Sequence, residues 1–252
     1  MVIRTEGIVL RGAPYGEADL IVTFFTRDEG LTQGFARSSR KVRSRFGAAL
    51  EPLSRVRISL MGKEGSSLPR ITQADIIESF QELRDDLATL VSLGPLVDLV
   101  RTLLHEREPH GRKYELLVAG LSSLVQASSR PVIVSCLIVK FLWMCGYGPR
   151  VSSCGRCGAT FSGGYGYFFP EHGAMLCQAC RIAGSGSALR TSRDTVHFFE
   201  EARSRTFGEL LGYFPPAGAL REAETLIERH ISQMCGGRCR PSLAMPALPR
   251  SS

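Results

Sequence analysis

The sequence predicts an α+β fold, in which a five-stranded barrel precedes a helical domain that carries a small four-cysteine module. Three observations lead to this prediction. The first eighty residues contain five short segments rich in β-branched and aromatic residues, which favour strands. From Phe80 onward the apolar residues recur at helical spacing. Two Cys-x-x-Cys pairs then lie within the helical half of the chain.

The expected strands are short and separated by turn signals. They cover residues 5–11, 18–26, 31–36, 53–60 and 68–79, with Pro14, Tyr15 and Gly16 as a loop after the first. Five short strands in about eighty residues favour a small closed barrel, and the five-stranded OB-fold is the leading candidate.

The rest of the chain is expected to be mainly helical. Gly94 and Pro95 are expected to break the first apolar run into two helices. Further helices are expected at 114–125, at 131–145 as the central helix, and at 195–203 and 220–234. This divides the chain into a barrel domain at 1–80, a helical domain at 81–240 with the cysteine module at 150–182, and a flexible tail at 241–252.

The cysteine module has the spacing of a zinc site. Cys154 and Cys157 form one pair, Cys177 and Cys180 form the other, and nineteen residues separate them. Each pair can place two thiolates on one turn, and the aromatic- and glycine-rich spacer suits a hairpin that brings the second pair to the other side of a tetrahedral Zn²⁺. The sequence therefore predicts one structural zinc ion in a zinc ribbon. Two disulfides or four ordinary thiols are the alternatives, and His172 could replace one cysteine.

Other cysteines and histidines give weaker signals. Cys136 and Cys145 lie in the apolar helix and are expected to be buried thiols. His230, Cys235 and Cys239 could form a second metal cluster, but they are interpreted as an exposed helix end and tail.

Composition restricts the function classes. The formal net charge is +7 with a pI near 9.2, which weakly favours a polyanionic partner such as nucleic acid. The first ten residues lack the layout of a signal peptide, and the longest apolar run, 131–145, is too short to cross a bilayer. The sequence therefore predicts a soluble intracellular protein with no membrane contact, in which paired cysteines bind metal more often than they form disulfides.

A basic segment follows the third expected strand. Residues 37–45 hold five cations and no acidic residue. In an OB-fold the loops between strands and the adjoining face of the sheet form the usual groove for single-stranded nucleic acid, and arginine binds phosphate bidentately. The alternative is a solvated loop. The candidate DNA-binding residues are Arg37, Arg40, Lys41, Arg43, Arg45, Arg55 and Arg57.

Several segments together resemble the RecO family of bacterial recombination mediators. They are Tyr-Gly-Glu-Ala-Asp at 15–19, Thr-Arg-Asp-Glu-Gly-Leu at 26–31, Gly-Ala-Ala-Leu-Glu-Pro at 47–52, and Leu-Trp-Met-Cys-Gly-Tyr-Gly-Pro at 142–149, which leads into Cys154. The resemblance covers nearly the whole chain in order. The tail at 236–242 resembles the family's ending only loosely.

The resemblance implies a DNA-binding OB-fold and a helical domain with zinc. It also implies binding of single- and double-stranded DNA, annealing of complementary strands without ATP, and loading of RecA, together with RecR, onto DNA covered by single-strand-binding protein. The implied location is the bacterial cytoplasm, at the nucleoid. The family's helical domain binds the acidic C-terminal tip of single-strand-binding protein in an apolar pocket with basic residues, for which Arg130 and Lys140 are the candidates here.

The sequence lacks the motifs of the enzyme classes that its cysteines or a nucleotide could suggest. A zinc deaminase needs His-x-Glu and Pro-Cys-x-x-Cys, and neither occurs; four thiolates would also leave no open position on the metal for water. The chain has no Gly-x-x-x-x-Gly-Lys-Ser/Thr loop, so nothing indicates a nucleotide. The sequence thus predicts a protein without catalytic residues. The rival is an interaction module whose barrel and zinc ribbon bind RNA or protein.

Overall fold

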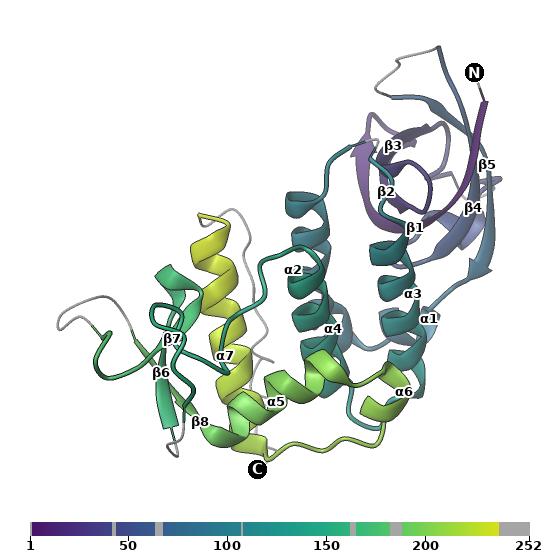
Figure 1. Ribbon diagram of the computed structural model, residues 1–252. Helices are drawn as coiled ribbons and strands as arrows, with labels where there is room; N and C mark the ends of the chain where they lie inside the picture. The colour runs from purple at the N-terminus through teal and green to yellow at the C-terminus, as the bar shows by residue number, and fades with distance from the viewer. Residues whose placement is uncertain are drawn as a thin grey trace. The chain divides into compact units, whose positions relative to one another are not determined.

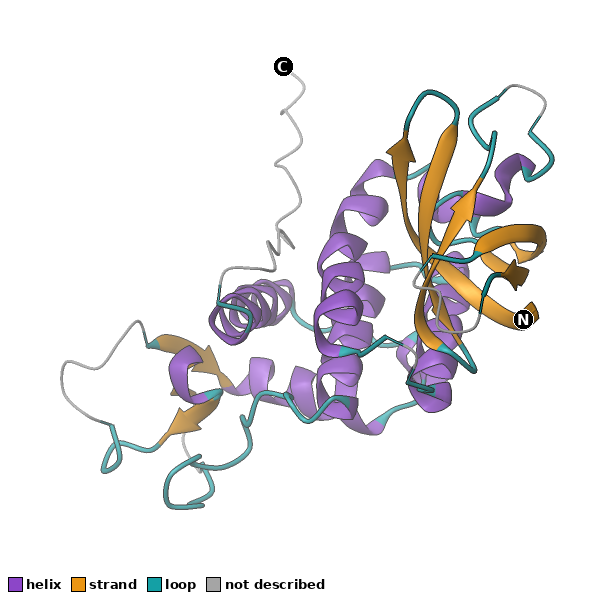
Figure 2. Ribbon diagram, turned by 90° about the horizontal axis from the view of Figure 1, so that it is seen from above, coloured by secondary structure: helices purple, strands orange, loops and turns teal. Residues whose placement is uncertain are grey.

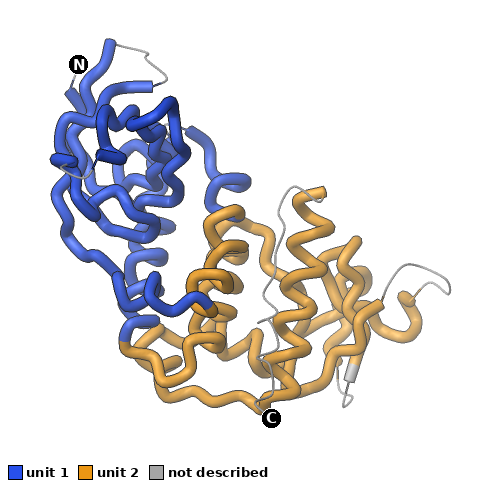
Figure 3. The backbone as a smooth tube through the Cα atoms, turned by 180° about the vertical axis from the view of Figure 1, so that it is seen from behind, with its two compact units in different colours: residues 1–87, 99–125 blue, residues 88–98, 126–252 orange. Residues whose placement is uncertain are grey.

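A computed structural model describes residues 2–41, 44–63, 68–106, 108–161, 165–181 and 188–236. The chain divides into two compact units, one formed by residues 1–87 and 99–125 and the other by 88–98 and 126–252 (Figure 3). The first unit holds the barrel, and the second holds most helices and the cysteine module (Figures 1 and 2). Among the described residues, no helix combines the length and the apolar character needed to cross a membrane.

The five N-terminal strands close into a barrel in the order β1-β2-β3-β5-β4. Its strands are β1 (Val2–Tyr15), β2 (Asp19–Thr26), β3 (Gly30–Ala36), β4 (Arg55–Met61) and β5 (Arg70–Glu78). β1 pairs antiparallel with both β2 and β4, and β3 meets β5 in parallel at Phe35 and Arg70. The predicted α+β fold with an N-terminal OB-type barrel is confirmed. One detail was wrong, because Pro14 and Tyr15 continue β1 instead of forming a loop.

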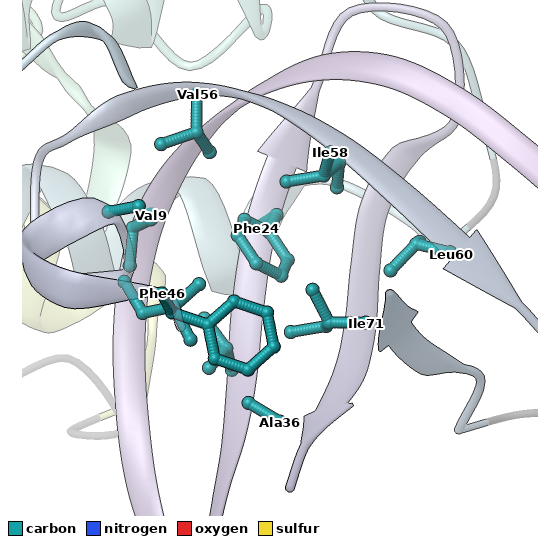
Figure 4. Packing of buried hydrophobic residues seen from close by; sticks show 11 residues of the cluster. Val9, Phe24, Ala36, Phe46, Val56, Ile58, Leu60 and Ile71 are labelled. Atoms are coloured by element: carbon teal, nitrogen blue, oxygen red, sulfur yellow. The ribbon is translucent and has the colours of Figure 1, made fainter. Parts of the chain in front are cut away.

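Alternating side chains fill the barrel, as the two-residue period of a strand requires. The cluster shown in Figure 4 is completely or almost completely buried. Gly34 lies against it, and a Cβ atom at Gly34 would come within 2.6 Å of Ile71 Cγ1, so the barrel has no room for a side chain there. The core residues are Val9, Val22, Phe24, Ala36, Phe46, Ala49, Leu50, Val56, Ile58, Leu60 and Ile71.

Helix α3 (Gly111–Gln126) belongs largely to the barrel unit. The Arg27 guanidinium lies 3.2 Å from the Glu115 carboxylate, and the rings of Phe25 and Tyr114 meet edge to face at 5.9 Å. Gly30 has a φ of +62°, and a Cβ atom there would clash with the backbone of Glu108. The barrel and residues 99–125 therefore fit together too closely for a side chain at this turn.

The expected helix break at Gly94 and Pro95 is wrong. After the short α1 (Gln81–Arg84), α2 runs without interruption from Leu87 to Leu103 with Pro95 inside it. A proline removes one hydrogen bond from the helix ladder, but Leu93 and Leu96 on either side are buried. Burial of these side chains offsets the lost bond.

The second unit is built around α4 (Arg130–Met144), in which residues 132–139, 141 and 142 are all buried. This confirms the central apolar helix. Around it lie α5 (Arg193–Ser204), α6 (Phe207–Leu210) and α7 (Ala217–Met234), of which α6 was not predicted. The predicted hairpin is present as β6 (Tyr165–Phe169) and β7 (Ala174–Leu176), and β8 (Leu189–Ser192) adds an unpredicted third strand on the other side of β6.

Two sequence predictions remain open in the structure. The boundary between the predicted domains 1–80 and 81–240 stays a prediction. The compact units divide the chain differently, because residues 99–125 belong to the same unit as the barrel. The tail at 241–252 lies outside the described residues, as does Cys239.

Candidate metal centre and basic surface

Two tight turns present the four cysteines. In the first, the Gly158 amide donates to the Cys154 carbonyl at 2.9 Å, and Gly158 itself has a φ of +76° that favours glycine. In the second, the Cys180 amide donates to the Cys177 carbonyl at 3.0 Å. The first turn is joined to the hairpin because the Gly155 amide donates to the Met175 carbonyl at 2.8 Å. The residue just before Cys177 is the end of β7, so the hairpin delivers the second pair to the first.

The four thiol groups converge on one point. Their sulfur atoms all lie within 4.8 Å of one another, and Cys157 Sγ lies 3.7 Å from Cys177 Sγ. In a tetrahedral site with metal–sulfur bonds of about 2.3 Å, two sulfurs are about 3.8 Å apart. The four cysteines are therefore positioned to bind one metal ion, and His172 is not part of the group.

Electrostatics at the cluster favour a bound cation. Burial tends to raise the pKa of Cys154, but the amides of Cys157, Cys177 and Arg156 hydrogen-bond its thiolate and lower the pKa to about 6. Hydrogen bonds to Cys157 and Cys177 raise the pKa of Cys180 to about 12. Without a cation, four crowded thiols cannot all ionise, whereas a divalent ion compensates their charge.

One small apolar cluster lies next to the cysteines. Cys154, Phe169 and Leu176 are buried in it, with Tyr167 packed alongside. The guanidinium of Arg181 lies 4.4 Å above the Tyr167 ring, next to the second cysteine pair.

Helix α7 supports this module through His230. The His230 Nε2 atom lies 2.7 Å from the Tyr147 carbonyl oxygen and donates to it, and its ring meets Phe168 edge to face at 5.8 Å. Burial lowers the pKa of His230, against the opposing effect of the Tyr147 carbonyl. His230 and Cys235 are both buried. Their interpretation as an exposed helix end was wrong, because the apolar face of α7 continues through them.

The basic segment is held against the turn between β1 and β2. The Ser38 amide donates to the Asp19 carboxylate at 2.6 Å, and the Arg40 amide donates to the Ala18 carbonyl at 2.9 Å. The Arg40 side chain also donates to the Glu17 carbonyl at 3.3 Å. These contacts fix the backbone of residues 37–41 and leave the charged ends of its side chains at the surface.

Most of the predicted cations in this segment are exposed. Arg37, Arg40, Lys41 and Arg45 are all exposed, and Arg43 lies outside the described residues. Arg45 also donates to the Ile71 carbonyl at 2.9 Å and lies 4.6 Å above the Phe46 ring, so it connects the segment to β5.

Arg55 and Arg57 differ from these residues because both pair with Glu6. Their guanidinium nitrogens lie 3.0 Å and 3.3 Å from the Glu6 carboxylate on the neighbouring strand β1. Burial tends to raise the pKa of Glu6, but the hydrogen bonds from Arg55 and Arg57 lower it overall. Glu6 was not singled out in the sequence, where nothing indicates that it faces two arginines some fifty residues later.

The two candidate partner-binding residues lie at opposite ends of α4. Arg130 begins the helix and is half-buried. Lys140 Nζ donates to the carbonyls of Arg205 at 2.6 Å and Arg203 at 3.4 Å, and lies 5.7 Å from the Phe207 ring. Burial lowers the pKa of Lys140. Lys140 therefore binds one carbonyl in the last turn of α5 and the carbonyl of the residue that caps this helix, groups that the helix itself leaves unpaired.

Comparison with known proteins decides the family. The model of the recombination protein O N-terminal domain matches residues 1–80, and that of its C-terminal domain matches residues 84–243. The chain belongs to the RecO family. A DNA repair protein RecO of Rubrobacter xylanophilus is 37% identical over 245 residues, covering 97% of this chain and 96% of the relative. Another, from Anaeromyxobacter sp. (strain K), is 32% identical over 247 residues and 94% of each chain.

Membership in the RecO family places the chain among proteins of DNA repair and recombination. The predicted resemblance is confirmed, and it extends across both compact units. A third relative with the same name, from Thermodesulfovibrio yellowstonii, is 32% identical over 236 residues. The two matched ranges thus span the barrel and the helical part of the chain.

Proposed function

We propose that this RecO chain binds single- and double-stranded DNA through the basic segment of its barrel and anneals complementary strands without ATP. The observation that carries the proposal is the set of exposed cations Arg37, Arg40, Lys41 and Arg45 on a backbone that hydrogen bonds fix to the barrel. Arginine and lysine side chains in such a position can contact successive phosphates without covering base edges.

The mechanism is electrostatic. Two DNA strands repel each other through their phosphates, and cations at the barrel surface screen part of this repulsion. The bases stay free to pair, so annealing needs no energy source beyond base pairing itself. Arg55 and Arg57 join this function when a phosphate competes with Glu6 for their guanidinium groups.

The partners are proposed from the family. RecR, the acidic tip of single-strand-binding protein and, functionally, RecA are the expected partners, and Arg130 and Lys140 are the candidates for binding the acidic tip. The expected location is the bacterial cytoplasm. The metal is proposed to be one structural Zn²⁺, because a four-thiolate tetrahedral site suits zinc and leaves no open coordination position.

The central test removes three exposed cations. In Arg37→Ala/Arg40→Ala/Lys41→Ala, we expect the log–log salt slope of single-strand binding to become less negative by about two, since each phosphate contact contributes about −0.7. Fluorescence annealing of complementary oligonucleotides without ATP should slow in parallel. Both are measured between about 50 and 200 mM salt, the range over which such contacts are strongly weakened.

A matched control variant has the same net charge as the basic-segment variant. Arg112→Ala/Arg221→Ala/Arg229→Ala removes three exposed cations from α3 and α7 and should leave the salt slope near the wild-type value. Equal salt slopes for the wild type and the barrel variant would contradict DNA binding by the basic segment. The interaction module for RNA or protein would then be the better interpretation.

A further inference from the structure

Two aromatic rings lie at the surface of the barrel beside the basic segment. Tyr15, at the end of β1, is 56% exposed, and its ring meets that of Phe35 edge to face at a centroid distance of 5.8 Å. Phe35 lies between Gly34 and the buried Ala36 on β3. Because side chains alternate along a strand, the inward position of Ala36 directs Phe35 outward.

Phe46, the third aromatic residue near the basic segment, has a different position. Its side chain is only 5% exposed and belongs to the barrel core (Figure 4). It therefore cannot stack on a ligand without opening the barrel. Tyr15 and Phe35, called here the aromatic pair, are the rings beside this segment that a ligand can reach.

Cations lie on both sides of the aromatic pair. On one side, Arg37 follows Phe35 by two residues, and Arg40 is hydrogen-bonded to the turn that follows Tyr15. On the other side, the exposed Arg70 is the bridge partner of Phe35 on β5. In the described turn that follows Tyr15, the acidic residues are Glu17, which is exposed, and Asp19, whose carboxylate accepts the Ser38 amide.

We infer that the aromatic pair is a stacking site for an unpaired base of single-stranded DNA, with Tyr15 as the ring that contacts it. This inference rests on the proposed function and adds a preference for single strands to it. An exposed ring between cations matches the way single strands are bound, with phosphates on arginine and bases on aromatic faces. In a duplex the bases are stacked on each other, so Tyr15 has no base face to contact.

This site has a consequence for annealing. A base held on Tyr15 has its flat face covered, while its pairing edge points away from the ring. The strand is therefore kept unfolded but remains able to pair. When the complementary strand pairs with it, stacking within the new duplex replaces stacking on Tyr15, and the duplex is released from this contact.

The test compares intact and abasic oligonucleotides on three proteins. Tyr15→Ala should weaken single-strand binding between about fivefold and a hundredfold, the range found when one stacking ring is removed, and should leave duplex binding unchanged. Tyr15→Phe keeps the ring and should bind like the wild type. Abasic strands should bind the wild type and Tyr15→Ala equally, because a strand without bases has nothing to stack.

Two controls test whether the loss of binding is specific to Tyr15 and to base stacking. Phe214→Ala removes another exposed aromatic ring, which is 66% exposed in the second unit, and should leave binding unchanged. The salt slope of Tyr15→Ala should equal that of the wild type, since no phosphate contact is lost. Urea unfolding of each variant confirms that the barrel is intact.

The outcomes distinguish this inference from the proposed function. If the basic-segment variant shows the less negative salt slope but Tyr15→Ala binds intact strands like the wild type, the stacking site is wrong and the proposed function stands. Equal losses on single strands, duplexes and abasic strands would also overturn the stacking site. A wild-type chain that binds no DNA at all would remove both.

Discussion

Glu6 shows how one residue connects the stability of the barrel with its charge. Its carboxylate lies between Arg55 and Arg57 and is only 25% exposed, so solvent weakens this ion pair less than one at a free surface. Because both arginines lower the pKa of Glu6, its contribution to stability is complete above the pKa of an unfolded glutamate, about 4.3, and is lost as the pH falls through the lower folded pKa.

Glu6→Gln should reduce the free energy of unfolding by about 1 kcal/mol at pH 7. The difference from the wild type should begin to shrink as the pH falls below about 4.3, the pKa of an unfolded glutamate, and should disappear only below the lower folded pKa, where the wild-type carboxylate is also neutral. Urea unfolding at several pH values measures both. Glu17→Gln, which removes a carboxylate without an ion pair among the described residues, should show no such difference.

Two glycines, one in a helix and one in a strand, differ in the space available for a side chain. Gly218 lies in the first turn of α7, and a Cβ atom there would meet no heavy atom within 4 Å beyond its chain neighbours and the helix backbone. Gly34 lies inside β3, where a Cβ atom would come within 2.6 Å of Ile71 and 3.1 Å of Leu60. The same substitution should therefore change stability in opposite directions.

Gly218→Ala should stabilise the chain by roughly 0.5 kcal/mol, because alanine loses less backbone entropy than glycine in a helix. Gly34→Ala should destabilise it by about 1–3 kcal/mol, since the barrel core has to shift to admit the methyl group. Chemical denaturation at pH 7 gives both values. A destabilising Gly218→Ala would mean that the first turn of α7 is not helical.

Across the whole molecule, the cysteine cluster and the proposed DNA-binding surface belong to different units. The four cysteines lie in the second unit, and the basic segment and aromatic pair lie in the barrel unit. Trp143, the single tryptophan of the chain, lies on α4 of the second unit and reports its unfolding. The role of the metal can therefore be measured separately from DNA binding.

Cys154→Ser or removal of the metal with a chelator should lower the melting temperature followed by Trp143 fluorescence by at least about 5 °C. Metal content should fall, while the salt slope of single-strand binding stays unchanged. Cys145→Ser, which removes a thiol outside the cluster, should keep the metal content of the wild type. A Cys154→Ser protein that stays folded but loses DNA binding would instead indicate direct contact between the ribbon and DNA.

Sequence reasoning succeeded where a feature depends on residues close together in the chain. The strands of the barrel, the apolar helix α4 and the two cysteine turns follow from local periodicity and spacing. It failed at Pro95, where buried neighbours outweigh the helix-breaking tendency of proline, and at His230, which the apolar face of α7 carries into the interior. Both errors arise because burial depends on packing partners that local patterns do not reveal.

The sequence by itself determined the fold class, the family resemblance, the metal-binding cysteines and the position of the basic segment, because each depends on local composition or spacing. Only the tertiary structure decided that Glu6 neutralises part of the charge of Arg55 and Arg57, that Lys140 binds the end of α5, and that Tyr15 is exposed beside the half-buried Phe35 while Phe46 is buried. These features join residues far apart in the chain, and their contacts exist only after the barrel closes and the helices pack.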